Sequence, residues 1–286
     1  MTNQSDIQIT VFDGACGAGF SNPDLRDYRI SKTSIGAEFP EEFELTMPSV
    51  KNQGNIGSCV AHSICLVAEY FNKIQYGIDN QLSVGYVYGN RVPPLNKNKG
   101  MITRYAIANF CADGTPLAKD FPLHCEVPEI IEEVEKVKDS LHDKARQFRF
   151  TSYVKTAKPE EIKTALLDGN PVIIAVDWYK DIKIKDGIIV SENKESDGGH
   201  AIVIYGWDKN GWKIQNSWSG FWGNHGCAVW PYSYKIREAY AIIDTESSAL
   251  DIEKPHKAKT KFGRWCIKAA NIIYSFFYSI KYKLTK

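Results

Sequence analysis

The spacing of apolar residues changes halfway along the chain, from a helical period to an alternating one. Residues 59–76 are apolar around most of a helix circumference, which is typical of a buried helix. Residues 129–144 mix acidic and basic side chains around one apolar face, which predicts a solvated helix. Shorter helices are expected at 82–88 and 101–111. The first half of the chain is therefore predicted to be mainly helical.

After residue 147, short β-type runs follow one another with Gly or Asn turns between them. Residues 148–154 alternate as a strand, 159–167 predict a short helix that starts at a proline, and 171–176 are apolar as in a buried strand. Further strands are expected at 187–190, 201–205, 212–215, 227–230 and 239–243. A helical lobe followed by an antiparallel sheet lobe is an α+β fold, and we expect a cleft between the lobes.

Both ends of the chain differ from this central part. Residues 1–46 contain few apolar residues in any period and several Gly and Pro, so we expect a leading arm or a short pro-region near the cleft. The folded domain is then expected at 47–248, with the helical lobe at about 47–147 and the β lobe at about 148–248. Residues 249–286 are expected to form a basic linker and an amphipathic helical tail.

Composition indicates a soluble globular protein, because 43% of the 286 residues are hydrophobic and 24% are charged. The net charge of +1 hides an asymmetry. Nine of the 35 basic residues and none of the 34 acidic residues lie in 254–286, which leaves a balance of −8 for the rest. The basic amphipathic tail suits an anionic membrane surface, but a helix docked on a partner protein or on the body fits equally well. No nucleic-acid partner is expected.

The seven cysteines show no CxxC spacing, so neither a zinc site nor a dense disulfide framework is indicated. No metal and no cofactor are expected. A reducing compartment fits this cysteine usage best. The N-terminus lacks a basic stretch followed by an apolar one, so we expect no Sec-type signal peptide. The predicted location is cytoplasmic, or exported by another route, and the tail leaves a peripheral membrane location open.

One loop combines the features of an activated nucleophile. Gln53 begins a glycine-containing loop that ends at Cys59, and Cys59 opens the buried helix. A thiol at a helix N-terminus lies where backbone N–H groups and the helix dipole favour a thiolate. The Gln53 amide could donate a hydrogen bond close to the same sulfur. This loop is therefore predicted to supply a nucleophile and part of an oxyanion hole.

A suitable base occurs in the second half of the chain. His200 follows Gly198 and Gly199 at the head of a predicted strand, and these glycines leave room for a substrate chain. Asn216 ends the next strand, where its side chain could accept a hydrogen bond from His200 and orient the ring. Trp218 is placed to shield that hydrogen bond from water.

Taken together, these residues resemble the motifs of the papain-like cysteine peptidases, especially bacterial, archaeal and viral members with a short N-terminal segment. The resemblance covers roughly residues 20–245. The matching motifs stand in the family's order: Gln53 to Cys59, Gly199-His200-Ala201, and Asn216-Ser217-Trp218 followed by Trp222-Gly223. The resemblance implies a papain-like two-lobed fold, a thiol protease activity and a peptide or protein substrate.

The resemblance also implies a role for each residue. Cys59 would be the nucleophile, His200 the general base and later the general acid, and Asn216 the residue that orients His200. Gln53 would form the oxyanion hole together with the Cys59 backbone N–H. Gly100 would pair its backbone with substrate. The implied reaction is acyl transfer through a thioester, followed by hydrolysis.

Three positions depart from the family pattern. Ile56 replaces the usual loop cysteine, so the disulfide that braces this loop in secreted relatives is absent. Val60 replaces the usual tryptophan after the nucleophile, and Ser219 stands where glycine usually follows the Trp. None of these changes removes a group that the reaction requires. The unbraced loop is expected to be held by packing alone.

Two alternatives remain open from the sequence. An amidase, deamidase or acyltransferase acting on one particular protein would use the same three residues. A catalytically silent binding module would use the cleft for recognition, although an intact Cys-His-Asn set argues against silence.

Overall fold

The computed structural model describes residues 16–21, 29–30, 38–91, 100–122, 130–193, 195–244 and 252–253. Among the described residues, four helices precede the main run of strands, and a fifth lies within it. They are α1 (Cys59–Tyr76), α2 (Val84–Gly89), α3 (Thr103–Asp113), α4 (Ile130–Ala145) and α5 (Pro159–Leu167).

The strands form one large, mostly antiparallel sheet and one small parallel pair. The described strands of the large sheet run in the order β13-β2-β5-β12-β6-β9-β10-β11-β8-β7, with β3 paired to β9. Its central strands are β5 (Ser152–Thr156), β12 (Ile236–Ile243), β6 (Val172–Tyr179), β9 (Ser196–Trp207), β10 (Gly211–Gln215) and β11 (Cys227–Pro231). Its outer strands are β2 (Arg29–Ile30), β13 (Ile252–Glu253), β3 (Phe43–Glu44), β7 (Lys183–Lys185) and β8 (Ile188–Val190). The pair consists of β1 (Ala18–Gly19) and β4 (Met101–Ile102).

Helix α1 is the element that joins the two halves. Its residues from Cys59 to Asn72 are all buried, as the all-round apolar pattern predicts. The helix ends at Gly77, which adopts the left-handed conformation that glycine tolerates best and donates its N–H to the last turn. Helix α1 contacts β9 directly, so the start of α1 lies against the strand that carries His200.

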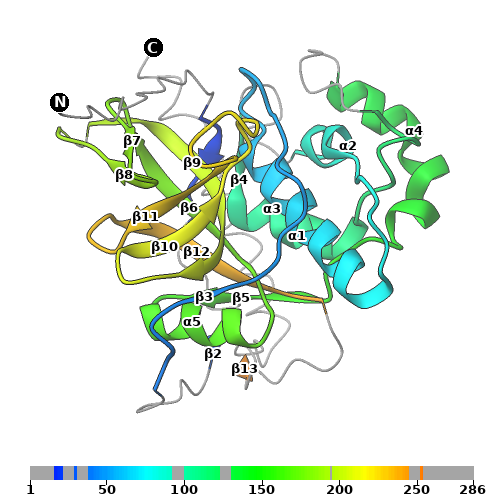
Figure 1. Ribbon diagram of the computed structural model, residues 1–286. Coiled ribbons are helices and arrows are strands. Elements are labelled where there is room, and N and C mark those ends of the chain that lie inside the picture. The colour runs from blue at the N-terminus through cyan, green and yellow to red at the C-terminus, as the bar shows by residue number, and fades with distance from the viewer. Residues whose placement is uncertain are drawn as a thin grey trace, which may run out of the picture.

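The described residues form two apolar cores, which suits a two-lobed fold. One gathers α1 to α4 and the face of the sheet that they cover, and the other lies within the β half around Trp207 and Trp230. Figure 1 shows α1 to α4 on one side of the molecule, the β6 to β12 strands on the other, and α5 beside the sheet. The predicted α+β fold with a helical and a sheet half is confirmed.

Most expected elements occur, with shifts at their ends. Helices α1 and α5 have the predicted bounds, whereas β5 starts at Ser152 rather than at 148. Strands β6, β9 and β12 extend beyond the predicted runs. The described part of 1–46 contains short strands, β1, β2 and β3, that its composition did not reveal.

The predicted linker and tail span residues 249–286. The structure describes only residues 252–253 of them, and residues 254–286 lie outside the described part of the chain. Within the described part of the chain, no helix has the length and apolar character needed to cross a bilayer.

Candidate active site

Cys59 is the first residue of α1 and is completely buried. Its sulfur lies within hydrogen-bonding reach of the backbone N–H groups of Ala201, Gly17 and Val60 and of its own N–H. Burial raises the pKa of the Cys59 thiol to about 11, although these N–H groups act to lower it. The predicted stabilisation by the helix start is therefore present but smaller than the effect of burial. The thiol is neutral in this arrangement.

His200 and Asn216 are hydrogen-bonded, with 2.8 Å between His200 Nε2 and Asn216 Oδ1. The backbone N–H of Ser217 also donates to Asn216 Oδ1 at 2.8 Å, which identifies this atom as the amide oxygen. An oxygen acceptor requires that His200 Nε2 carries a proton. In the neutral ring, His200 Nδ1 then holds a lone pair. Nδ1 is buried and makes no hydrogen bond to any residue that the structure describes.

Two tryptophans surround the His200 ring. Trp218 stacks on it with ring centroids 4.5 Å apart, and Trp178 contacts it edge-on at 4.8 Å. Burial lowers the pKa of His200 to about 4, against a smaller opposite effect of the Asn216 hydrogen bond. Trp218 stands in a sequence motif beside Asn216, whereas Trp178 was not predicted because no motif contains it. Trp178 stands in β6, where its pairing opposite Gly198 of β9 brings it beside His200.

Gln53 is buried, and both ends of its amide are engaged. Its Nε2 donates to the carbonyl of Ile56 at 2.7 Å, and its Oε1 accepts from Ser217 Oγ at 2.5 Å. The Gln53 backbone N–H donates to the Ser217 carbonyl at 2.8 Å. The loop before Cys59 is thus joined to the segment that follows Asn216. These contacts fix the orientation of the Gln53 side-chain amide between the loop and Ser217.

Polar contacts, and not packing alone, hold this loop in place of the missing disulfide. Lys51 pairs with the buried carboxylate of Glu69 on α1 at 2.7 Å. The Lys51 carbonyl accepts from the Ser219 backbone N–H at 3.0 Å, and Asn52 forms a β-bridge with Trp218. The expectation of packing alone was wrong, because it considered only the loop and not the partners that the fold brings to it.

The three glycines predicted to bind substrate lie around one segment of the chain itself. Gly199 accepts the Gly17 N–H at 2.9 Å, and a Cβ added at Gly199 would stand 1.9 Å from the Ala18 carbonyl oxygen. A Cβ at Gly100 would stand 2.2 Å from the Gly17 carbonyl oxygen. A Cβ at Gly198 would stand 3.0 Å from Cys16 Cβ. Glycine is needed at Gly199 and Gly100 because another backbone approaches closely, whereas Gly198 is approached by the Cys16 side chain.

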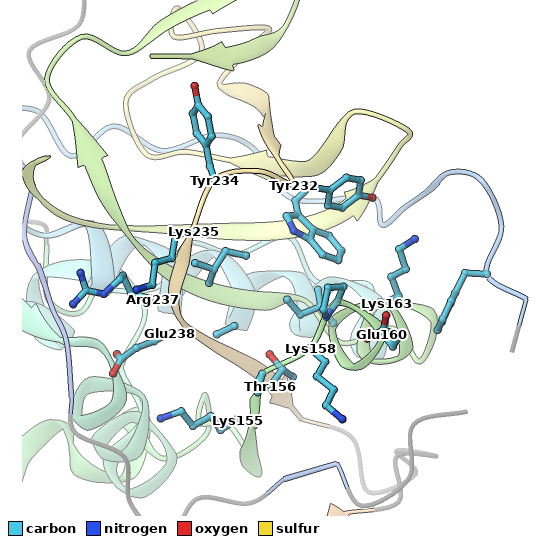
Figure 2. A pocket seen from close by; sticks show the side chains of 17 residues that line it. Lys155, Thr156, Lys158, Glu160, Lys163, Tyr232, Tyr234, Lys235, Arg237 and Glu238 are labelled. Atoms are coloured by element: carbon cyan, nitrogen blue, oxygen red, sulfur yellow. The ribbon is translucent and has the colours of Figure 1, made fainter. Parts of the chain in front are cut away.

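A metal site and a ligand pocket are the other features at which chemistry could take place. Among the described residues, no group of three or more His, Cys, Asp and Glu side chains could hold a metal ion. A pocket of about 670 Å³ lies between α5 and β12, with walls that include Tyr232, Lys163 and Lys235 (Figure 2). Cys59, His200 and Asn216 do not line it, so the candidate reaction and this pocket are separate features.

The chain is similar to known proteins over most of its described length. The family model for the papain family cysteine protease matches residues 40–241, which is more than half of the chain. Cathepsin O of Mus musculus is 24% identical over 213 residues, which cover 70% of this chain and 64% of the relative. Cathepsin B-like cysteine proteinase 5 of Caenorhabditis elegans is 36% identical over 86 residues, covering 28% and 25%. These matches span less than two-thirds of the relatives' own lengths.

A solved structure shows the same fold. Xylellain, a cysteine protease from Xylella fastidiosa, superposes with a TM-score of 0.70 at 22% identity, covering 82% of this chain and all of that one. The family match covers the Gln53–Cys59 loop, His200 and Asn216. The chain therefore belongs to the papain family of cysteine proteases.

Proposed function

We propose that this protein is a cysteine peptidase that hydrolyses peptide bonds of a peptide or protein substrate through an acyl-enzyme on Cys59. The observation that carries the proposal is the hydrogen bond between His200 Nε2 and Asn216 Oδ1, which sets the tautomer of the ring. Because Asn216 Oδ1 requires a proton on Nε2, His200 Nδ1 is the nitrogen that can take the Cys59 proton. A ring held in the opposite tautomer could not act as the base at this position.

The reaction would proceed in two stages. The Cys59 sulfur attacks the peptide carbonyl carbon as its proton passes to His200, and His200 then donates that proton to the leaving amine. A water molecule, deprotonated by His200, hydrolyses the thioester and releases Cys59. Asn216 keeps the ring oriented through both stages.

The oxyanion would form next to the start of α1. The N–H of Cys59 and the Gln53 amide are the proposed donors to this oxygen. One proton of the Gln53 amide is donated to the Ile56 carbonyl. The amide group has two protons, and the proposal requires that Gln53 donates one of them to the oxyanion when substrate binds. Substrate backbone would lie between Gly199 and Gly100, where Gly17 and Ala18 lie in the present structure.

The test combines selective labelling with cleavage. An epoxide-type thiol inhibitor is expected to label Cys59 faster than the other six cysteines in reducing buffer. A peptide library is expected to be cleaved by the wild type and by Cys65→Ala, but not by Cys59→Ala. Cys65 is a suitable control because it is equally buried on the same helix. Cleavage that survives Cys59→Ala would contradict the proposal.

A further inference from the structure

A short segment of the chain bridges the two halves directly over the nucleophile. This bridging segment consists of residues 16–21. Gly17 donates its N–H to the Gly199 carbonyl at 2.9 Å and accepts from the Met101 N–H at 2.8 Å. A Cβ added at Gly17 would stand 2.0 Å from the Gly57 carbonyl oxygen. The segment therefore contacts the loop before Cys59, the start of β4 and the strand that carries His200.

The far end of the bridging segment has an anchor of its own. Ser21 donates through both its N–H and its hydroxyl to one oxygen of Glu238, at 2.7 and 2.6 Å. The Ser21 hydroxyl lies 3.2 Å from the Tyr240 hydroxyl. Arg237 lies 4.5 Å from the centre of the Phe20 ring. Arg237 and Glu238 follow one another on β12, as Figure 2 shows, so both anchors belong to the β half.

The bridging segment begins with a cysteine that lies beside Cys59. The N–H of Gly17, which is bonded directly to the Cys16 carbonyl carbon, acts to lower the pKa of the Cys59 thiol, so this part of the segment lies near the sulfur. The Cys16 carbonyl oxygen would be 3.2 Å from a Cβ at Gly57, two residues before Cys59. Disulfides join residues whose Cα atoms are roughly 4.4–6.8 Å apart. Gly17 lies against Gly57, and Cys59 contributes to the raised pKa of the Cys16 thiol, so the two cysteines are neighbours across this contact. A cross-link requires their Cα atoms to come within the disulfide range. Both thiols are free in the structure.

We propose that Cys16 and Cys59 form a reversible disulfide that locks the bridging segment over the nucleophile. The cross-link itself needs only the two thiols. Its effect on activity rests on the proposed function of Cys59. In the reduced protein the segment is held by non-covalent contacts alone and can give way to substrate, whereas in the oxidised protein the nucleophile is consumed and the site is covered.

The oxidant is a small-molecule disulfide such as glutathione disulfide. One thiolate of the pair attacks a glutathione sulfur, forms a mixed disulfide and releases one glutathione thiolate. The second cysteine then attacks the protein sulfur of that mixed disulfide and releases the other glutathione. In total, two protein thiols lose two protons and two electrons, and one glutathione disulfide becomes two glutathione thiols. A dithiol reductant reverses both steps.

Thiol–disulfide exchange at Cys16 is expected to be slow while the bridging segment is in place. Burial, together with the smaller effects of the neighbouring Cys59 and Asp197, raises the pKa of the Cys16 thiol to about 12. Thiolate is the attacking form, so the exchange rate is expected to increase with pH.

The experiment uses the full chain, first reduced and then placed in glutathione buffers of increasing oxidised fraction. After quenching with iodoacetamide, peptide mapping by mass spectrometry is expected to show a peptide pair joined through Cys16 and Cys59. Alkylation of Cys59 is lost in parallel, and dithiothreitol restores it. Because the cross-link is measured by mass, the result does not depend on whether Cys59 hydrolyses peptides.

Three variants make the test specific. Cys16→Ser is expected to carry a glutathione adduct on Cys59 instead of an internal cross-link, and to regain its free thiol at a milder reducing ratio. Cys227→Ser, which removes another half-buried thiol, keeps the cross-link. Gly17→Ala retains both thiols but clashes with Gly57, so its cross-link yield falls. A wild type in which Cys59 carries glutathione while Cys16 remains alkylated, or in which Cys59 pairs with another cysteine, would overturn the proposal.

Discussion

The environment of His200 depends on a residue that no motif contains. Trp218 belongs to the Asn216-Ser217-Trp218 run, whereas Trp178 lies on β6, far from it in the chain. The Trp178 ring contacts both His200 and Trp218 with centroid distances of 4.8 Å. It therefore excludes water from the imidazole on a side that Trp218 does not cover. We assign Trp178 a positioning role, because it acts through His200.

Replacing Trp178 distinguishes its exclusion of water from His200 from its contribution to core packing. Trp178→Ala is expected to lower the free energy of unfolding by about 3–5 kcal/mol, because a large core side chain is lost. It also admits water to His200, so the pKa of the imidazole rises from about 4 toward its ordinary 6.5. The acid limb of the pH profile for Cys59 alkylation should then move to higher pH. Trp178→Phe, which keeps an aromatic ring, is the matched control. Equal acid limbs in the wild type and Trp178→Ala would argue against this role.

Among the elements, the short pair of β1 and β4 is the one that bears on access to Cys59. Each strand has only two residues, yet β1 lies where substrate backbone is proposed to bind. The bridging segment that contains β1 is held by contacts at both ends, with Gly17 against Gly57 and Ser21 against Tyr240. A strand this short has little stability of its own. The Ser21 anchor is therefore expected to determine how often the bridging segment leaves.

Weakening this anchor should expose Cys59. Ser21→Ala removes the hydroxyl hydrogen bond to the buried Glu238 carboxylate, and a hydrogen bond to a charged group contributes about 1.5–3 kcal/mol. Alkylation of Cys59 in reducing buffer should accelerate by at least about tenfold, since 1.4 kcal/mol corresponds to a factor of ten.

Ser140→Ala is the matched control for this experiment. It removes a serine hydrogen bond on α4, from Ser140 Oγ to the Val137 carbonyl, away from the site. Its alkylation rate should equal that of the wild type. If Ser21→Ala and Ser140→Ala react alike, the anchor does not govern access to Cys59.

Across the whole molecule, buried histidines link folding to pH. Burial lowers the pKa of both His62 and His200 to about 4, and His62 is hydrogen-bonded to the Ser58 carbonyl at 3.0 Å. Each ring is neutral in the folded protein, whereas in the unfolded chain it takes up a proton near pH 6.5. Their contribution to stability is complete above about pH 6.5, is lost as the pH falls from there to about 4, and does not change further below that. Burial acts oppositely on Asp244, whose pKa is raised to about 7.

A comparison of wild type with His62→Gln isolates one histidine from these opposing effects. Between pH 7.5 and 4.5 the wild type should lose more free energy of unfolding than the variant, by at most about 3 kcal/mol. Urea unfolding at the two pH values measures this difference. Glutamine retains a side-chain N–H that can donate to Ser58, so the variant should still fold. An equal pH-dependent loss in both proteins would show that His62 is not responsible.

Local sequence was sufficient to predict much of the fold and the identity of the candidate site residues. The bounds of α1 and α5 follow from apolar spacing, a glycine after α1 and a proline at the start of α5, all of which act within a few residues. The order of a helical and a β half follows from the change of period. Cys59, His200 and Asn216 stand in short motifs, so each could be named before its neighbours in space were known.

Contacts between distant parts of the chain determined the rest. The sequence does not show that Trp178 lies against His200, that Lys51 and Glu69 brace the Cys59 loop, or that Cys16 lies beside Cys59. Helix dipole and backbone N–H groups favour a thiolate at Cys59, as predicted locally, but burial by the assembled fold opposes them and raises the pKa. Burial is the sum of what every neighbouring element covers. For that reason the motifs could identify the candidate groups, and only the packed molecule set their protonation and their access to solvent.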